Sequence, residues 1–359
     1  MNKILKHAAL GTVALAACGA QAQSSVTVAG MADAAVRSVS NQGVGSVKSL
    51  VSGSNSTSRI IIRGVEDLGG GMSASFWLEH GLALDTGAAA QATQFWDRRS
   101  TVSLSGKSWG EVRAGRDFVP TYVGWSRFDP FGHIGAAGSN NFATATPNGP
   151  IRSAFGTNPN TTVRANNALQ YFLPAGLGGL EGSLMLAAGE GGAVASGLTK
   201  VTGLRLGWAG GGYGLSVATA TSENSLTTAG KFKDTAIGGN ATLGSLRLTA
   251  AWRKFEQNAA EQTNVMVGAI YSMGQSDIKF SYLKANMAGR VGTTVIDAND
   301  ATQMGLGYIY NLSKRSALYT HYARISNKGA ATFVVPGGPA GIGGGKTSTG
   351  YEAGLRHTF

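Results

Sequence analysis

The sequence predicts an all-β protein whose strands close into an antiparallel transmembrane barrel of sixteen strands. Segments in which apolar and polar side chains alternate recur from residue 23 to the end of the chain, and alternation gives each face of a strand its own character. Glycine is abundant, at 54 of 359 residues. Beyond the N-terminus no segment approaches the roughly 20 consecutive apolar residues of a spanning helix, so a membrane location requires closed strands.

The segment from Tyr351 to Phe359 shows the alternation most clearly. Its side chains form two rows, Tyr351, Ala353, Leu355 and Phe359 on one face and Glu352, Arg356 and Thr358 on the other. One face suits lipid and the other suits water. A buried parallel strand would be apolar on both faces, and an amphipathic helix would repeat every 3.6 residues, so the pattern favours a membrane strand.

The N-terminus has the composition of a secretory signal peptide over residues 1–22. Two lysines form a charged segment, residues 8–17 are apolar, and Ala20-Gln21-Ala22 is a small-residue cleavage site. Cleavage there removes two of the 30 basic residues and none of the 19 acidic ones, so the formal charge falls from +11 to +9. We expect the barrel to occupy residues 23–359.

Cys18 is the only cysteine, and it would leave with the signal peptide. The mature protein should then contain no disulfide and no thiol-based metal site. An alternative stays open, because Leu15-Ala16-Ala17-Cys18 also has the form of a lipobox, whose processing would leave Cys18 as a lipidated first residue. The strand-like segment that starts at Ser25, directly after the small-residue site, favours the first interpretation.

The number of strands follows from the connections between alternating segments. Seven connections are short and rich in glycine or polar residues, at 66–71, 106–110, 174–179, 209–212, 243–245, 274–277 and 313–316. Eight are longer and polar, at 41–56, 85–93, 118–161, 189–199, 223–233, 256–261, 286–299 and 327–346. Fifteen connections join sixteen strands and place both termini on the short-turn side. A soluble β-sandwich is the alternative, but it would not explain glycines gathered on one row, where they widen a pore.

The motifs that suggest catalysis lack the context that their chemistry needs. Residues 340–347 approximate a phosphate-binding loop, but such a loop leads into a helix, whereas only twelve residues in strand alternation follow Thr347. The four histidines of the mature chain occur in unrelated segments, outside any nucleophile elbow and without metal-ligand spacing. We therefore predict no enzyme activity, no metal and no cofactor. An outer-membrane hydrolase with Ser and His on neighbouring strands is the alternative.

Arginines are the better candidates for functional residues. Arg59 and Arg63 alternate with Ile60 and Ile62, so both should face a water-filled lumen. Further positive groups would come from neighbouring strands, at Arg98 or Arg99, Arg116 and Arg164. In the alternative interpretation the arginines only stabilise the barrel, by pairing with Asp33, Glu79, Asp97 or Asp117. The number of arginines favours a field that acts on solutes.

Residues 58–71 (SRIIIRGVEDLGGG) resemble the trimeric general porins of Gram-negative outer membranes, particularly those of β-proteobacteria. The resemblance runs through the full length. It includes SVTV at 25–28, Gly115-Arg116 leading to Pro120-Thr121-Tyr122, FDPFG at 128–132 and GLRHTF at 354–359. Each motif is weak alone, but together they are specific.

This resemblance implies a sixteen-stranded homotrimer in the outer membrane, in which a loop at 118–161 folds inward and narrows the lumen. By motif position, a basic ladder falls on Arg59, Arg98 and Arg164, with Arg63 adjacent. Phe359 corresponds to the family's assembly signal and closes the barrel near the first strand. The implied partners are further copies of the chain, outer-membrane lipids and lipopolysaccharide, the barrel-assembly machinery, and small hydrophilic solutes and anions, with no nucleic acid.

The predicted inward loop departs from the family pattern, because Phe131 follows Pro130 where many relatives carry a glutamate. Between residues 118 and 163 the only carboxylate is Asp129, against Arg127 and Arg152. The constriction should therefore be mostly positive, and low-dielectric walls focus such a field. We expect passive diffusion of small hydrophilic solutes with a preference for anions. A barrel that serves mainly as a surface adhesin or receptor through its long loops is the alternative, and conduction would discriminate the two.

Overall fold

The computed structural model describes residues 25–157, 162–190 and 199–359. The predicted signal peptide at 1–22 and the alternative lipobox lie outside the described residues, as do parts of two predicted connections. The described chain is dominated by one antiparallel sheet of nineteen strands. Within these ranges no helix is long and apolar enough to span a membrane.

In chain order the strands are β1 (Ser25–Asn41), β2 (Gly45–Ser52), β3 (Arg59–Gly69), β4 (Met72–Ala83), β5 (Ala88–Ala89), β6 (Arg99–Gly106), β7 (Gly110–Phe118), β8 (Arg164–Phe172), β9 (Leu180–Ala187), β10 (Lys200–Gly210), β11 (Tyr213–Glu223), β12 (Phe232–Leu243), β13 (Leu246–Gln257), β14 (Ala260–Met273), β15 (Ser276–Val291), β16 (Thr294–Val295), β17 (Ala301–Asn311), β18 (Ser316–Asn327) and β19 (Thr347–Thr358).

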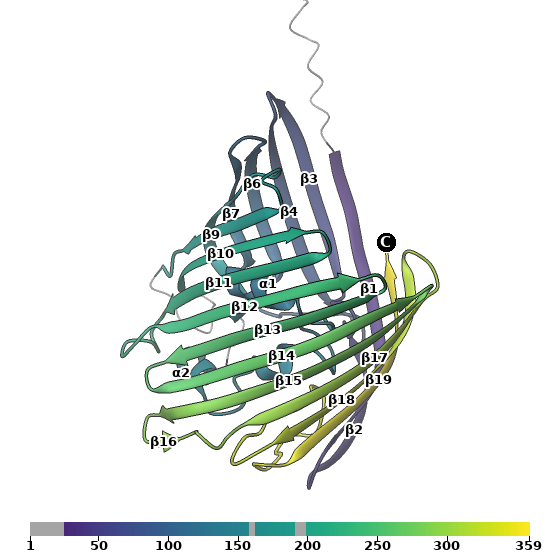
Figure 1. The fold of residues 1–359 in the computed structure, drawn as a ribbon, viewed down its shortest axis with the longest axis vertical. Coiled ribbons are helices and arrows are strands. Elements are labelled where there is room, and N and C mark those ends of the chain that lie inside the picture. The colour runs from purple at the N-terminus through teal and green to yellow at the C-terminus, as the bar shows by residue number, and fades with distance from the viewer. Residues whose placement is uncertain (1–24, 158–161, 191–198) are drawn as a thin grey trace, which may run out of the picture.

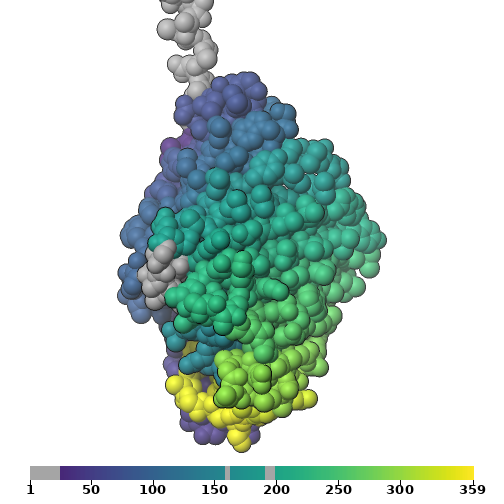
Figure 2. Space-filling view, turned by 90° about the vertical axis from the view of Figure 1, so that its left-hand side faces the viewer, coloured from purple at the N-terminus to yellow at the C-terminus, as the bar shows by residue number. Residues whose placement is uncertain are grey.

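The sheet closes into a barrel because β1 pairs antiparallel with β19, from Met31 opposite Thr358 to Asn41 opposite Ser348. Figure 1 shows the strands wrapping round a common axis, and the space-filling view shows the middle strands as a continuous wall (Figure 2). The short strands β5 and β16 belong to connections. Strands β2 and β3 both pair with β1 and together count as one strand of the barrel. Sixteen barrel strands result, which confirms the predicted fold class.

The chain ends join at the short-turn side of the barrel. The Gly30 N–H donates to the Phe359 carbonyl at 3.0 Å, and the Phe359 N–H donates back to the Gly30 carbonyl at 3.1 Å. The Phe359 ring lies over Gly30, where an added Cβ would come within 2.4 Å of the ring. A larger residue at position 30 would therefore displace the terminal ring.

All seven predicted short turns join consecutive strands, but the predicted long connection at 256–261 is wrong. Strand β13 runs on to Gln257 and β14 begins at Ala260, so only two residues turn the chain. Asn258 adopts a left-handed conformation with φ of 54°, which asparagine tolerates better than most residues. On the outer face Lys254 contacts Glu256 at 3.2 Å and Glu261 at 2.9 Å. The polar residues that suggested a loop are therefore part of the ends of β13 and β14.

Each barrel strand has an outward-facing row and a lumen-facing row. On β19, Tyr351 is 59% exposed on the outside while its neighbour Glu352 is 2% exposed inside. Most large exposed apolar side chains of the other strands, such as Val102 and Leu104 on β6, lie on the outward-facing row. The alternation predicted for the C-terminal strand is confirmed.

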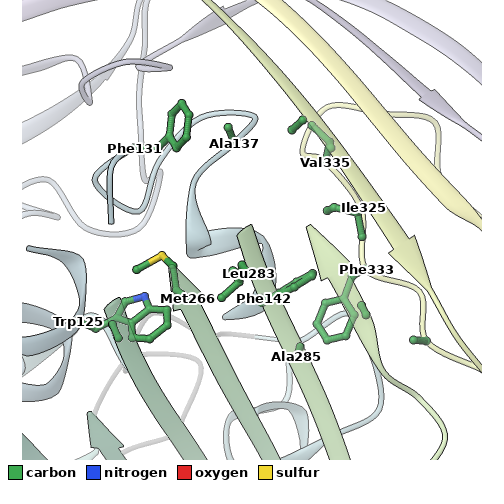
Figure 3. Close-up of a cluster of buried hydrophobic side chains, with 14 of the residues drawn as sticks. Trp125, Phe131, Ala137, Phe142, Met266, Leu283, Ala285, Ile325, Phe333 and Val335 are labelled. Carbon is green, nitrogen blue, oxygen red and sulfur yellow. The ribbon is translucent and has the colours of Figure 1, made fainter. Parts of the chain in front are cut away.

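The connection between β7 and β8 folds into the barrel, as the described residues 119–157 and 162–163 show. It contains α1 (Pro120–Ser126), the 3-10 helix η1 (Ser139–Phe142) and α2 (Pro150–Phe155). Proline starts both α-helices, where its missing N–H costs no intrahelical hydrogen bond. Figure 3 shows Trp125, Phe131 and Phe142 of this connection beside side chains of the wall. We call it the inward loop.

The apolar core lies between the inward loop and one side of the barrel. Trp125, Phe128 and Phe142 are almost fully buried there against residues of β12 to β18. The loop is also hydrogen-bonded to that wall, since Gln262 Nε2 donates to the Phe142 carbonyl at 2.6 Å and Gln303 Nε2 to the Ala137 carbonyl at 2.9 Å. Among the described residues, none of β3, β4, β6 or β7 belongs to a core cluster.

Candidate functional site: the arginine-lined wall of the lumen

Strand β3 places Arg59 and Arg63 on its lumen-facing row. Ile60 and Ile62 occupy the outward-facing row, where Ile62 lies opposite Val28 of β1, a residue with 62% of its surface exposed. The pairing register therefore agrees with the alternation in the sequence. Both arginines project from the wall that the apolar core leaves uncovered.

Glu79 on the lumen-facing row of β4 is the centre of a group of arginines. Its carboxylate lies 3.3 Å from Nε of Arg59 and 2.6 Å from Nε of Arg98. Arg164 at the start of β8 donates from Nε to the Arg98 carbonyl at 2.7 Å. We call Arg59, Arg98 and Arg164 the arginine cluster. With Glu79 as the paired carboxylate, three positive charges meet one negative charge.

Arg164 connects the arginine cluster to the inward loop. Its guanidinium carbon lies 4.4 Å from the centroid of the Phe118 ring, and Phe118 stacks on Tyr122 of α1 at a centroid distance of 4.8 Å. Cation–π contact holds a guanidinium without neutralising its charge. The first helix of the inward loop and the arginine cluster are therefore neighbours.

A second group of arginines lies nearer the short turns on the same wall. Arg63 and Arg99 flank the Trp77 ring, with guanidinium carbons 5.4 Å and 4.8 Å from the ring centroid. Trp77 in turn donates from Nε1 to Glu79 at 3.1 Å. The Trp77 indole thus lies between the guanidinium groups of Arg63 and Arg99, and its hydrogen bond to Glu79 connects them to the arginine cluster.

Sequence reasoning missed Arg113. This residue of β7 faces the lumen and lies 2.8 Å from Glu111 and 2.6 Å from Asp117, which is also 3.6 Å from Arg99. The alternation of Glu111, Arg113 and Asp117 with Val112 would have identified it. The described lumen face from β3 to β8 then carries six arginines, Arg59, Arg63, Arg98, Arg99, Arg113 and Arg164, against four carboxylates, Asp67, Glu79, Glu111 and Asp117.

The structure places Arg116 on the outward-facing row of β7, not on the row that lines the lumen. It pairs with Ser100, on the outward-facing row that also holds Val102, because the alternation that turns Arg113 and Asp117 inward turns Arg116 outward. Its side chain is buried and donates from Nε to the Asp97 carbonyl at 2.7 Å. Arg116 therefore holds the connection before β6 against β7. We do not count it among the residues that line the pore.

Asp129 is buried within the inward loop. Its carboxylate accepts backbone N–H groups from Phe131 at 2.8 Å, His133 at 2.9 Å and Ser139 at 2.8 Å. The neighbouring His133 is also buried, and burial together with nearby Arg253 and Arg164 lowers the pKa of its imidazole to about 3. Both oxygens of the loop's carboxylate are thus occupied by its own backbone, so Asp129 organises the loop.

In the alternative interpretation, the arginines only stabilise the barrel by pairing with four carboxylates. The structure shows such pairing for two of the four. Glu79 and Asp117 do contact arginines. The Asp33 carboxylate instead accepts backbone N–H groups from residues 54–56 and the Tyr319 hydroxyl at 2.5 Å. The Asp97 carboxylate accepts the Gly81 N–H at 2.7 Å. Two of the four expected partners are therefore engaged elsewhere, and the wall keeps its positive surplus.

A smaller basic group lies beneath the inward loop on the other side of the lumen. Glu181 of β9 forms ion pairs with Arg127 of the loop and with Arg205 of β10, the latter at 2.8 Å. Arg247 of β13 donates to the Arg127 carbonyl at 2.9 Å. Here three arginines surround one carboxylate, and two of them contact it directly. Positive charge therefore continues from the arginine cluster toward the short-turn side.

A closed barrel of sixteen two-faced strands with a charged lumen defines a membrane channel. Residues 8–330 match the family model described as Gram-negative porin, and the chain belongs to this family. It is 34% identical over 381 residues to outer membrane porin protein 32 of Delftia acidovorans, an alignment that covers 99% of this chain and 100% of that protein.

Further relatives agree. An outer membrane porin protein of Bordetella pertussis is 31% identical over 195 residues, which cover 49% of this chain and 45% of that protein. The solved anion-selective porin from Comamonas acidovorans matches with a TM-score of 0.77 and 32% identity, covering 94% of this chain and 100% of that one. OmpT of Vibrio cholerae matches with a TM-score of 0.65 at 12% identity over 94% of this chain and 98% of its own, which supports the fold alone.

Membership of this family identifies the chain as an outer-membrane channel for passive diffusion of small hydrophilic solutes. The structural and sequence relatives are channels. Across the described ranges, no three His, Cys, Asp or Glu side chains are grouped so that they could hold a metal ion.

Proposed function

We propose that this porin prefers anions and that the preference is set where the inward loop meets the arginine cluster. One observation carries the proposal: the single carboxylate of Glu79 contacts Arg59 and Arg98, and a third guanidinium, that of Arg164, lies beside them on the Arg98 carbonyl. The carboxylate of Asp129 is taken up by the loop backbone. A solved structure at 32% identity is of an anion-selective porin. Transport would be passive, with no chemical step.

The expected size of the effect follows from Coulomb's law. One uncompensated charge roughly 15 Å from a passing ion contributes about 1 kcal/mol at an effective dielectric constant near 20. Such an energy changes the local anion concentration about fivefold, and low-dielectric walls focus the field along the pore. A surplus of two or three charges is therefore sufficient for a measurable preference.

The working unit that we propose is a homotrimer. OmpT of Vibrio cholerae, a relative in fold, is described in a trimer form. Each subunit would conduct through its own lumen, because the arginine cluster and the inward loop belong to the same chain.

Reversal potentials in a salt gradient across a planar bilayer test the anion preference. We expect the sign of an anion-preferring channel for the natural sequence, and a several-fold lower anion-to-cation permeability ratio for Arg59→Gln and Arg98→Gln. Arg324→Gln is the matched control, because it removes the same charge from the exposed outward-facing row of β18 and should leave the ratio unchanged. A cation-type reversal potential, or an equal response to the control substitution, would overturn the proposal.

A further inference from the structure

Aromatic rings lie against several arginines of the lumen wall between β3 and β8. The guanidinium carbons lie between 4.2 and 5.4 Å from the ring centroids. The pairs are Arg63 and Arg99 with Trp77, Arg113 with Phe172, and Arg164 with Phe118. A ring in this position restricts the movement of a guanidinium and leaves its charge in place. Arginines held in this way keep a defined orientation toward a passing solute.

Arg63 differs from the other three arginines because it has no polar partner. Arg99 and Arg113 both contact Asp117, and Arg164 donates to a backbone carbonyl. Among the described residues, the side chain of Arg63 forms no ion pair and no hydrogen bond, and it is exposed on the lumen-facing row of β3. Its N–H donors are therefore available to a solute.

A cavity of about 310 Å³ opens beside Arg63. Across the strands, Thr27 of β1 lies opposite Arg63, and Arg63 lies opposite Trp77. Ser75 of β4 and Arg99 of β6 also line the cavity. Its volume is at the lower end of the range for small-molecule sites. The cavity therefore suits a solute with a single small ring.

The cavity also has an apolar side. Val65, two residues after Arg63 on β3, lines it and faces the lumen, yet 46% of its surface is exposed. Trp77 adds the apolar surface of its indole. An exposed valine in a water-filled lumen gains by contact with an apolar group. Together with the unpartnered guanidinium, these two side chains fit a solute that is both apolar and negatively charged.

A guanidinium can recognise such a solute in two ways. Its N–H edge matches a carboxylate, to which it donates two parallel hydrogen bonds, and its flat face stacks on aromatic rings. The hydroxyl groups of Thr27 and Ser75, which form no hydrogen bond within the described part of the chain, can donate to further carboxylate lone pairs. This combination favours a planar ring that carries a carboxylate.

We propose that this cavity is a subsite for aromatic carboxylates, in which Arg63 binds the carboxylate while Trp77 and Val65 contact the ring. Trp77 is also a positioning residue, because it holds Arg63 against the wall. The inference rests on the proposed function, since an aromatic carboxylate must enter the lumen as an anion. It adds a preference among anions that charge alone does not give. Aromatic contact should favour an aromatic carboxylate over a saturated one roughly twofold to tenfold.

The test uses two anions of equal charge and similar size, benzoate and cyclohexanecarboxylate. Single-channel currents of the full chain in a planar bilayer are recorded at pH 7 and a fixed chloride concentration while the sodium salt of one anion is added. The concentration that gives half of the maximal current reduction measures occupancy of the lumen. The variants are Arg63→Lys, which keeps the charge but loses the planar group, and Trp77→Leu, which removes the ring. Arg324→Lys, on the exposed outward-facing row of β18, is the matched control.

For the natural sequence and the control, we expect benzoate to reach half of its effect at a roughly twofold to tenfold lower concentration than cyclohexanecarboxylate. In Arg63→Lys and in Trp77→Leu the two concentrations should become equal. Equal concentrations in the natural sequence, discrimination that survives in either variant, or its loss in the control would overturn the proposal.

Reversal potentials in a sodium chloride gradient separate this result from the proposed function. An anion-type potential without discrimination between the two carboxylates would remove the subsite and leave the anion preference standing. A cation-type potential would overturn the anion preference and the subsite with it. An unchanged β-sheet circular dichroism spectrum and a conducting channel establish that the two variants are folded.

Discussion

Glu79 lies within ion-pair distance of both Arg59 and Arg98, so it opposes the field of the arginine cluster more directly than any other carboxylate described on this wall. Glu79→Gln should therefore act in the opposite direction to the arginine substitutions. Because glutamine keeps the shape and the hydrogen-bond acceptor but loses the charge, we expect the anion-to-cation permeability ratio to rise several-fold. Reversal potentials in the same salt gradient measure it.

Asp129→Asn is the informative comparison for Glu79→Gln. It removes a carboxylate whose oxygens already accept three backbone N–H groups inside the loop. Its main effect should be on loop order, seen as more frequent channel closures, with little change in the permeability ratio of the open state. A fall in anion preference for Glu79→Gln would show that this carboxylate holds the arginines in their working geometry.

Individual residues are predictable from sequence only where alternation is applied strictly. Alternation locates Arg59 and Arg63 on the lumen side. The same rule places Arg113 on the lumen-facing row and Arg116 on the outward-facing row. The sequence prediction assigns Arg116 to the pore because it lies on a neighbouring strand. The ion pairs of Glu181 with Arg127 and Arg205 could not be found in this way. They depend on where the inward loop crosses the barrel, and strand periodicity carries no information about that path.

The inward loop is the element whose stability should respond most to acid. His133 is buried, its Nδ1 lies 2.8 Å from the Ser139 hydroxyl, and its pKa is lowered from an ordinary value near 6.5 to about 3. Between those two values the displaced loop binds a proton that the folded loop excludes. Stability is therefore lost as the pH falls, by about 2 kcal/mol near pH 5 for a shift of this size.

We expect channel closures to become more frequent between pH 7 and pH 4, and His133→Asn to weaken this dependence. Asparagine is chosen because residue 133 has φ of 65°, a conformation that asparagine tolerates. His357→Asn, on the outward-facing row of β19, is the control. Single-channel recordings over this pH range provide the measurement. An identical pH dependence in His133→Asn and in the natural sequence would assign the acid response to another group.

Close packing of the inward loop against β12 and β14 depends on two lumen-facing glycines. A Cβ at Gly268 would lie 2.4 Å from Cγ of Pro130, and one at Gly238 would lie 2.3 Å from the Phe128 ring. Gly268→Val should therefore push the loop away from its wall and toward the arginine cluster, because proteins are too densely packed to absorb the volume locally. We expect a lower single-channel conductance and a smaller size limit for neutral sugars.

Ala250→Val is the matched control for Gly268→Val. It places the same branched side chain on the exposed outward-facing row of β13, so conductance should stay the same. A conductance equal to that of the natural sequence in Gly268→Val would mean that the loop does not border the narrowest part of the lumen. Both variants should fold, since valine favours strands.

Strands are predictable as elements because their two faces meet lipid and water, which impose a strict two-residue period. The prediction fails where strands rise above the lipid. Around 256–261 and 286–291 the outward-facing row becomes polar, and polar composition predicts a loop there although β13, β14 and β15 continue through these segments. The interior of the inward loop is beyond sequence reasoning for the opposite reason, since its helices pack against a wall assembled from distant strands.

At the scale of the whole molecule, the barrel wall separates two environments. The arginines lie on its lumen face, and the exposed aliphatic side chains lie on its outward-facing rows. Closure by β1 and β19 makes this separation complete, because it leaves no sheet edge through which water could connect the two faces. Substitutions on one side should therefore leave the other side's function unchanged.

The selectivity of the whole channel should depend on ionic strength in a graded way. The screening length falls from about 10 Å at 0.1 M salt to about 3 Å at 1 M, so contributions from the second group of arginines and from the group around Glu181 should disappear first. At a fixed ratio of salt concentrations we expect the anion preference to shrink as mean salt rises. A residual preference should persist at 1 M in the natural sequence, because ions pass the arginine cluster at close range, and should be smaller in Arg59→Gln. Reversal potentials at several mean salt concentrations measure both the decrease of the preference and the residual preference at 1 M. A preference that does not change with salt would point to selection by size instead of charge.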